Sequence, residues 1–238
     1  MPAVIRKLKY KTVFRLFIYG TNRYFSRSPT KGEMKEKWID WAMRLQSVAQ
    51  AGLTFGETSY DLDRYQQIRD ISVEIMNEYT EAGTKKITDL FASDTGYQTP
   101  KVDIRSAVFR DNRILMVREK IDGAWSLPGG WADVTTSVSE SAARECLEEA
   151  GAKVKPRRII AIHQADRHYD FPYPYTVYKI FVECELIEQA FTINTETLEA
   201  GFFGKDELPP LSAERNTAKQ IALCFSARQQ ASFEAVFD

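Results

Sequence analysis

Three glutamates, Glu145, Glu148 and Glu149, stand close together in this 238-residue sequence. Their spacing of three and four residues would put them side by side on one face of a helix. Like charges at that spacing repel each other, so either water screens the cluster or a cation holds it together. Hard carboxylate oxygens suit Mg²⁺, which proteins usually hold with one or two carboxylates, waters and substrate phosphates. The spacing alone is more typical of a solvated acidic face. Together with Gly130, Arg144, the helix cap and Gly151, it predicts a magnesium site for phosphate chemistry.

The residues around the glutamates predict the helix that must position them. Ser137 and Glu140 fit the S-x-x-E capping box, so a helix should begin directly after Ser137 and run over 138–150. Gly151 follows as its natural end. The Leu-Pro-Gly-Gly stretch at 127–130 is a turn that would bring backbone toward this helix.

The flanking sequence predicts a sheet around this helix. Apolar segments at 102–110 and 113–119 are separated by Asp111-Asn112, a pair typical of hairpin turns. Further strands are predicted at 158–165, 175–186 and 201–204, and a final helix at 214–225. The pattern predicts an α+β unit with a mixed sheet.

The sequence before this unit has a helical period. Apolar residues recur at three- and four-residue spacing over 38–49 and 61–79, and a short third helix is expected at 85–92. We therefore predict three parts. They are a basic extension at 1–33, a helical N-terminal domain at 34–98 and a catalytic domain at 99–238.

Charge is distributed unevenly between these parts. Residues 1–33 hold eight Lys or Arg and one acid, whereas the remainder has a net charge of −8. An acidic body argues against a general nucleic-acid binder. The extension is expected to be disordered or to result from a misplaced start before Met34; a targeting segment or a basic arm is the alternative.

Cysteine content and hydropathy indicate the compartment in which the protein is expected. Three widely spaced cysteines argue against a disulfide framework and favour a reducing, cytoplasmic compartment. No apolar run approaches the roughly 18 residues of a membrane span. We therefore expect a protein without a membrane partner.

The sequence around the glutamates resembles the Nudix hydrolases, whose box reads G-x5-E-x7-R-E-U-x-E-E-x-G-U, with U aliphatic. The matching positions are Gly130, Arg144, Glu145, Glu148, Glu149 and Gly151, with Cys146 and Ala152 at the two U positions. The first box glutamate is replaced by Thr136; in the family that glutamate helps to order the box by pairing with its arginine. Segments on both sides of the box look like the subfamily with a helical N-terminal domain, which includes ADP-ribose and CDP-choline pyrophosphatases. The resemblance implies a Nudix fold, a mixed sheet between helices, preceded by a small helical domain.

The resemblance also implies an activity and a site. Nudix enzymes hydrolyse the pyrophosphate bond of nucleoside diphosphate derivatives, giving a nucleoside monophosphate and X-phosphate. By resemblance, Glu145, Glu148, Glu149 and the Gly130 carbonyl would bind Mg²⁺, with Mn²⁺ as an alternative. Arg144 would orient the glutamates. The general base would be Glu148 or a loop carboxylate, Glu196 or Glu199.

Substrate contacts are expected outside the box. The candidates for substrate binding are Arg105, Arg118, Trp131 and Tyr173, and an aromatic-rich stretch at 163–175 could stack a base. His163, within an apolar strand pattern, is expected to be structural. RNA-directed pyrophosphohydrolase or exonuclease activity and a non-catalytic ligand sensor are the rival functions. The aromatic stripe of the helical unit suggests a homodimer, by analogy at the level of the fold.

Overall fold

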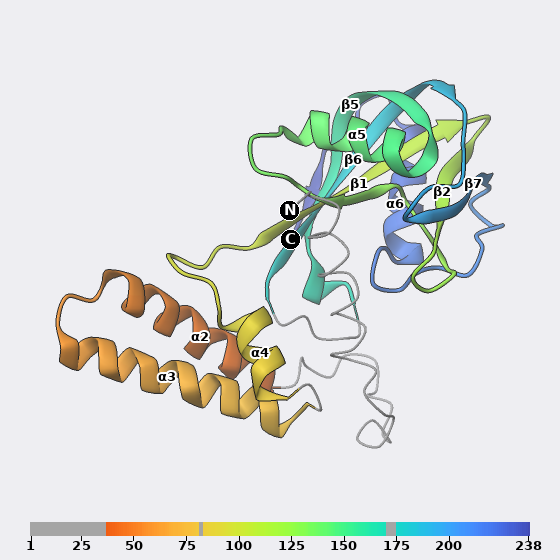
Figure 1. The fold of residues 1–238 in the computed structure, drawn as a ribbon. Helices are drawn as coiled ribbons and strands as arrows, with labels where there is room; N and C mark the ends of the chain where they lie inside the picture. The colour runs from red at the N-terminus through yellow and green to blue at the C-terminus, as the bar shows by residue number, and fades with distance from the viewer. Residues whose placement is uncertain (1–36, 81–82, 170–174) are drawn as a thin grey trace. The chain divides into compact units, whose positions relative to one another are not determined.

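The computed structural model describes residues 37–80, 83–169 and 175–238 (Figure 1). The chain divides into two compact units between Thr99 and Pro100, and each unit is described by itself. The predicted basic extension at 1–33 lies outside the described residues.

The N-terminal unit is helical, as predicted. It contains α2 (Lys37–Phe55), α3 (Ser59–Glu78) and the short α4 (Thr84–Phe91). Its core is formed mainly by Ile39, Ala42, Val73, Met76, Ile87 and Phe91. In the described part of the chain, no helix has the length and apolar character needed to cross a bilayer.

The second unit is built on one mixed sheet, also as predicted (Figure 1). Its strands are β1 (Lys101–Arg110), β2 (Arg113–Glu119), β3 (Trp125–Ser126), β4 (Gly129–Trp131), β5 (Ala152–Gln164), β6 (Val177–Gln189), β7 (Thr197–Phe203) and β8 (Val236–Phe237). The order is β3-β2-β1-β6-β5-β8, with β4 paired to β1 and β7 paired to β2. β1 and β6 run parallel, as do β5 and β8, whereas the other pairs are antiparallel.

The hairpin between β1 and β2 forms where Asp111 and Asn112 predicted it. Both residues have positive φ angles, 51° and 57°, as a two-residue type I′ turn requires. The turn sets the register, in which Arg110 faces Arg113. This register decides which side chains of β1 and β2 face each side of the sheet.

Alternating side chains of β1 and β2 build two cores, one on each face of the sheet. Ile104, Val108, Leu115 and Val117 pack with Ala142, Cys146 and Ala150 of α5 (Val138–Ala150). Their neighbours Ala107, Phe109, Ile114 and Met116 pack with Ile221, Cys224 and Phe225 of α6 (Ala218–Gln229). The sheet therefore lies between α5 and α6, which confirms the predicted Nudix arrangement.

Three elements begin four or more residues away from their predicted starts. β5 begins at Ala152 rather than 158, because Ala152 and Val154 are buried while the intervening Lys153 and Lys155 are exposed. β7 begins at Thr197 rather than 201. The final helix begins at Ala218 rather than 214, because Thr217 and Gln220 form a capping box that the prediction overlooked.

Candidate active site

Helix α5 is fixed at both ends. The Ser137 hydroxyl accepts a hydrogen bond from the Glu140 amide at 3.2 Å, and the Glu140 carboxylate accepts one from the Ser137 amide at 2.8 Å. These bonds lower the pKa of Glu140, so the cap is at full strength at neutral pH. At the other end, Gly151 adopts the left-handed conformation, with φ of 58°, and its amide donates to the Cys146 and Leu147 carbonyls. The box residues therefore lie on a helix of defined length.

The three glutamates of α5 lie in different surroundings. The side chains of Glu145 and Glu149 are buried, 1% and 2% exposed, whereas Glu148 is exposed. The amide of Gly129 donates to Glu149 Oε2 at 2.9 Å. The Glu145 carboxylate lies against Gly130, where an added Cβ would come within 3.2 Å of Oε2. Two box carboxylates thus face the glycine pair, and the third faces solvent.

The glycine pair can lie there because β4 approaches β1 closely. Gly129 pairs with Arg105, and Gly130 with Ile104. A Cβ on Gly129 would lie 1.9 Å from the Ile104 carbonyl oxygen, so only glycine fits. β4 is therefore held between β1 and the buried glutamates.

Arg144 lies between two carboxylates. Its Nη1 is 2.7 Å from Asp133 Oδ2, and its Nη2 is 3.4 Å from Glu145 Oε1. The side chain of Arg144 is 28% exposed and that of Asp133 43%. Arg144 therefore contacts one box carboxylate and one carboxylate from outside the box. Asp133 was not singled out from the sequence.

A loop crosses the C-terminal end of α5. The Asn194 side-chain amide donates to the carbonyls of Glu148 and Glu149 at 3.0 and 3.4 Å. The Thr197 hydroxyl donates to the Glu149 carbonyl at 2.7 Å. Asn194 Oδ1 accepts from the amides of Glu196 and Thr197, both at 2.9 Å. The loop carrying Glu196, one candidate base, is therefore bonded directly to the end of the box helix.

Two other predicted site residues pair with each other. Arg118 on β2 faces Glu199 on β7, and Arg118 Nη1 is 3.0 Å from Glu199 Oε1. Both side chains are well exposed, at 41% and 55%. An exposed pair of this kind contributes little to stability, about 0–1 kcal/mol. Either side chain could therefore exchange its partner for a ligand at low cost.

Arg105 is the predicted substrate contact that the structure places in the interior. Its side chain is 1% exposed, and Nε and Nη2 donate to the two carboxylate oxygens of Asp103 at 2.9 and 2.8 Å. Burial alone would lower the pKa of Arg105, but Asp103, Glu149 and Glu119 raise it above its usual value. The guanidinium thus stays charged behind the box glutamates, and its burial separates it from the other predicted substrate contacts.

The charged cluster around Arg105 extends across the sheet to β6. Lys179 is 2% exposed, and its Nζ lies 3.4 Å from Asp103 Oδ2. Burial lowers the pKa of Lys179 to about 7, which the attraction of Asp103 opposes. Arg105 and Lys179 in turn outweigh the effect of burial on Asp103 and lower its pKa. The sequence prediction did not identify Asp103 or Lys179, whose strand positions resemble those of exposed charges.

Trp131 lies beside a second aromatic side chain. The rings of Trp131 and Tyr175 are 6.2 Å apart at 58°, and Lys101 Nζ is 5.3 Å from the Tyr175 ring centre. All three side chains are partly exposed. Tyr173 lies outside the described residues. The apolar rings and the neighbouring ammonium group suit a nucleobase with attached phosphate.

His163 lies in a packed environment, as expected of a structural residue. It is 5% exposed, stacks on His168 with ring centres 3.9 Å apart, and lies 3.4 Å from the Gln220 amide through Nδ1. Burial and the neighbouring His168 lower the pKa of His163. Its ring is therefore neutral at pH 7 and packs against α6.

The donor atoms of the site fit a hard divalent cation. Glu145, Glu148, Glu149 and the Gly130 carbonyl offer only oxygen, and the Cys146 thiol on the same helix is buried in the core. Among residues 37–80, 83–169 and 175–238, no three acidic, His or Cys side chains are placed to hold a metal ion together, and this includes the three box glutamates. Mg²⁺ needs only one or two carboxylates when waters and phosphates complete its shell. The residues present therefore fit Mg²⁺ that binds together with a phosphate compound.

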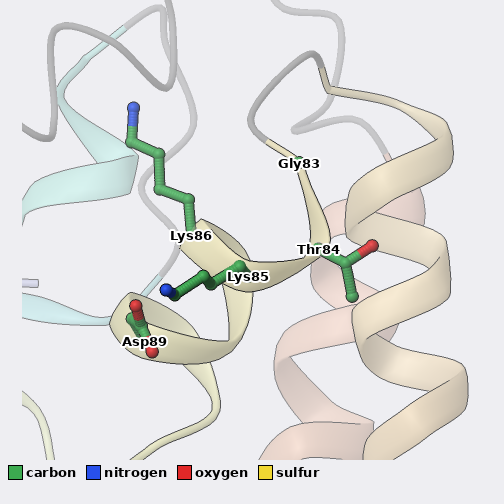
Figure 2. A pocket seen from close by; sticks show the side chains of 5 residues that line it. All are labelled: Gly83, Thr84, Lys85, Lys86 and Asp89. Carbon is green, nitrogen blue, oxygen red and sulfur yellow. The ribbon is translucent and has the colours of Figure 1, made fainter.

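One open cavity of about 430 Å³ lies elsewhere, at the start of α4 (Figure 2). It is lined by Gly83, Thr84, Lys85, Lys86 and Asp89. In Figure 2 the two lysines extend from the first turn of the helix. None of these residues belongs to the Nudix box. We therefore place the candidate active site at α5, where the box side chains lie.

Both units match known protein families. Residues 100–224 match the family model described as NUDIX domain. Residues 36–91 match the model described as UDP-X-like, N-terminal oligomerisation domain. The Bacillus subtilis (strain 168) protein named "Putative ADP-ribose pyrophosphatase YjhB" is 41% identical over 206 residues, covering 87% of this chain and 99% of that protein.

Solved structures agree with these matches. An ADP-ribose pyrophosphatase from Streptococcus suis is 44% identical, with a TM-score of 0.55, over 59% of this chain and 100% of its own. A UDP-X diphosphatase is 28% identical, with a TM-score of 0.56, over 85% of this chain and 98% of its own. With the box geometry of α5 and β4, these matches establish that the chain belongs to the Nudix hydrolases, as a pyrophosphatase preceded by a UDP-X-like N-terminal oligomerisation domain.

Proposed function

We propose that this protein hydrolyses ADP-ribose in a Mg²⁺-dependent reaction. Water would cleave the pyrophosphate bond, and the products would be AMP and ribose 5-phosphate. The main support is the position of two buried carboxylates, Glu145 and Glu149, which lie against the backbone of Gly129 and Gly130. Glu148 is exposed on the same helix. Buried carboxylates are costly unless they are paired or bind a cation.

The bound metal would neutralise the diphosphate and make a water molecule more acidic. Glu148, which is exposed on the same helix, would accept a proton from the attacking water. Arg144 holds the Glu145 carboxylate in place, and the Gly129 amide does the same for Glu149. A well-placed general base contributes about 10²- to 10⁴-fold to the rate.

Two observations favour ADP-ribose among nucleoside diphosphate derivatives. Relatives named as ADP-ribose pyrophosphatases match the chain at 41% and 44% identity. Trp131 and Tyr175 offer two apolar ring faces, and Lys101 beside the Tyr175 ring offers a positive charge, for an adenosine phosphate. CDP-choline and UDP-linked compounds are the alternatives, since the UDP-X diphosphatase also resembles the chain.

Incubation of the full chain with Mg²⁺ and single substrates tests this proposal. The panel contains ADP-ribose, CDP-choline, a UDP-sugar and capped RNA, and the released monophosphate is measured by chromatography. We expect AMP from ADP-ribose at the highest kcat/KM, and loss of turnover when EDTA removes the metal. Higher turnover of capped RNA would favour the RNA-directed function instead. Tight binding without turnover would favour the ligand sensor.

We also propose that the protein is a homodimer formed through α2. Its N-terminal unit matches an oligomerisation domain. Trp41, Val48 and Phe55 recur every seven residues along α2 and are 53%, 54% and 67% exposed. This spacing forms one stripe, as in the seam between paired helices. A second copy of the same stripe would bury these side chains.

A further inference from the structure

The box of this protein lacks one carboxylate, and a different acid occupies its place beside the arginine. The Nudix box has glutamate at the position of Thr136, whereas Arg144 here pairs with Asp133 at 2.7 Å. Asp133 lies three residues closer to β4 than Thr136 does. The pair is a charge-assisted contact of the short, strong kind.

This pair determines where Arg144 points. An arginine side chain samples many rotamers unless a partner holds it. Asp133 contacts Nη1, and the neighbouring Nη2 then lies 3.4 Å from Glu145 Oε1. The Glu145 side chain is 1% exposed and lies against Gly130. A chain of contacts therefore runs from Asp133 through Arg144 to a carboxylate of the proposed metal site.

Thr136 holds the turn that presents Asp133. Its hydroxyl donates to the Asp133 carbonyl at 2.8 Å, and its amide donates to the same oxygen at 3.3 Å. The Thr136 hydroxyl also lies 2.9 Å from that of buried Ser141 on α5. Thr135, which lies between Asp133 and Thr136 in the chain, has a φ of 71°. A β-branched residue adopts this conformation only where the surroundings enforce it. The turn is therefore fixed relative to the helix.

We propose that Asp133 is a positioning residue that replaces the missing box glutamate. It orients Arg144, which in turn holds Glu145 for metal binding, while Thr136 fixes the turn from which Asp133 reaches the arginine. A purely structural ion pair would explain the same contact. The two roles differ in their effect on metal affinity and on rescue by a carboxylate at position 136.

Variants of the full chain separate these roles. Asp133→Asn keeps the shape and removes the charge, and Asp133→Asn/Thr136→Glu returns a carboxylate from the other position. Loss of a residue that orients a metal ligand typically costs about 10- to 100-fold in metal affinity or activity. We expect Asp133→Asn to lose Mn²⁺ affinity by this factor, as measured by electron paramagnetic resonance. The kcat for ADP-ribose should fall by a similar factor, with little change in KM. The double variant should recover most of both.

Glu207→Gln is the matched control. It removes an exposed ion pair of similar length, Arg113 Nη2 to Glu207 Oε2 at 2.8 Å, far along the chain from the box. We expect wild-type Mn²⁺ affinity and kcat. A folded Asp133→Asn with wild-type Mn²⁺ affinity would overturn the proposal, as would losses that Thr136→Glu does not restore. If Asp133→Asn does not fold, the double variant Asp133→Asn/Thr136→Glu decides, because wild-type Mn²⁺ affinity in it supports positioning and lost affinity in a folded double variant contradicts it.

The expected loss of kcat rests on the proposed function, whereas the expected loss of Mn²⁺ affinity does not. If the wild-type chain turns over no nucleotide, the proposed function fails. The Mn²⁺ affinities of the same variants still support or overturn the role of Asp133.

Discussion

Burial divides the three box glutamates into two kinds. Glu145 and Glu149 are almost completely shielded and are held by Arg144 and by the Gly129 amide. Glu148 faces solvent on the same helix. Proton transfer with water needs an accessible carboxylate, whereas fixed ligands benefit from being held. The structure therefore supports different roles for the three residues.

We expect Glu148→Gln to lower kcat for ADP-ribose by about 10²- to 10⁴-fold, the usual contribution of a general base. The fold should persist, because the side chain is exposed. Steady-state kinetics and thermal unfolding measure the two effects. Glu74→Gln, on the exposed surface of α3, is the control and should leave both unchanged. A folded Glu148→Gln variant with normal kcat would remove Glu148 from the mechanism.

Lys179 should make stability depend on pH. Burial lowers its pKa from the ordinary value of 10.5 to about 7. Between pH 7 and pH 10.5 the unfolded chain binds a proton at Lys179 that the native chain does not, so the free energy of unfolding rises with pH. The rise from this group is at most about 1.4 kcal/mol per pH unit. Below pH 7 both states are protonated, and the group adds no further dependence.

Denaturant unfolding at pH 7 and pH 9 checks this expectation. Lys179→Met should abolish the increase in the free energy of unfolding between the two pH values. Lys153→Met changes an exposed lysine paired with Glu188 and should retain the increase. Equal pH dependence in the wild type and Lys179→Met would show that Lys179 stays protonated in the native protein.

At residue scale, the sequence shows the spacing of the candidate site residues but not the surroundings that the fold gives them. The E-x-x-E-E spacing on a capped helix is local, so Glu145, Glu148 and Glu149 were identified without a fold. Arg105 shows why other residues were not. The spacing of Asp103 and Arg105 along β1 puts both side chains on one face of the strand. The burial of that face depends on β4 and β6, which pair with β1, and cannot be derived from the spacing. Asp133 likewise gains its role from a turn that brings it to Arg144.

At the scale of elements, local signals determined most boundaries. Capping residues placed the start of α5 correctly, and Asp111-Asn112 placed the hairpin. The same kind of signal at Thr217 and Gln220 would have corrected the start of α6. β3 and β4 are too short for any periodicity, and they exist because neighbouring strands pair with them.

The cap of α5 should carry measurable stability. Ser137→Ala removes the oxygen that accepts from the Glu140 amide, and loss of such a cap costs about 0.5–2 kcal/mol. Ser226→Ala is a matched change inside α6, where the hydroxyl bonds only the preceding turn at the Ala222 carbonyl. We expect that variant to be neutral or slightly stabilising, because alanine is the better helix former. Denaturant unfolding of the two variants tests the difference, and equal effects would contradict it.

At the scale of the whole molecule, the N-terminal helices match an oligomerisation domain, and we propose that α2 forms the dimer contact. We expect Val48→Glu to raise the dimer dissociation constant at least about tenfold, because a buried unpaired charge would lie in the middle of the α2 stripe. Light scattering coupled to size exclusion measures the mass across a dilution series. Ile71→Glu on α3, where Ile71 is 48% exposed, is the matched control and should leave the dimer intact. Dissociation by Ile71→Glu alone would assign the contact to α3.

Asn194 joins the end of α5 to the loop that leads into β7. Amide protons of a surface loop usually exchange with solvent quickly, whereas those of a cooperative unit are released together. Because one side chain bonds both segments, the amides of Glu196 and Thr197 should exchange in D₂O at the rate of the helix end. Asn194→Ala should release them early and leave the opposite end of α5 protected.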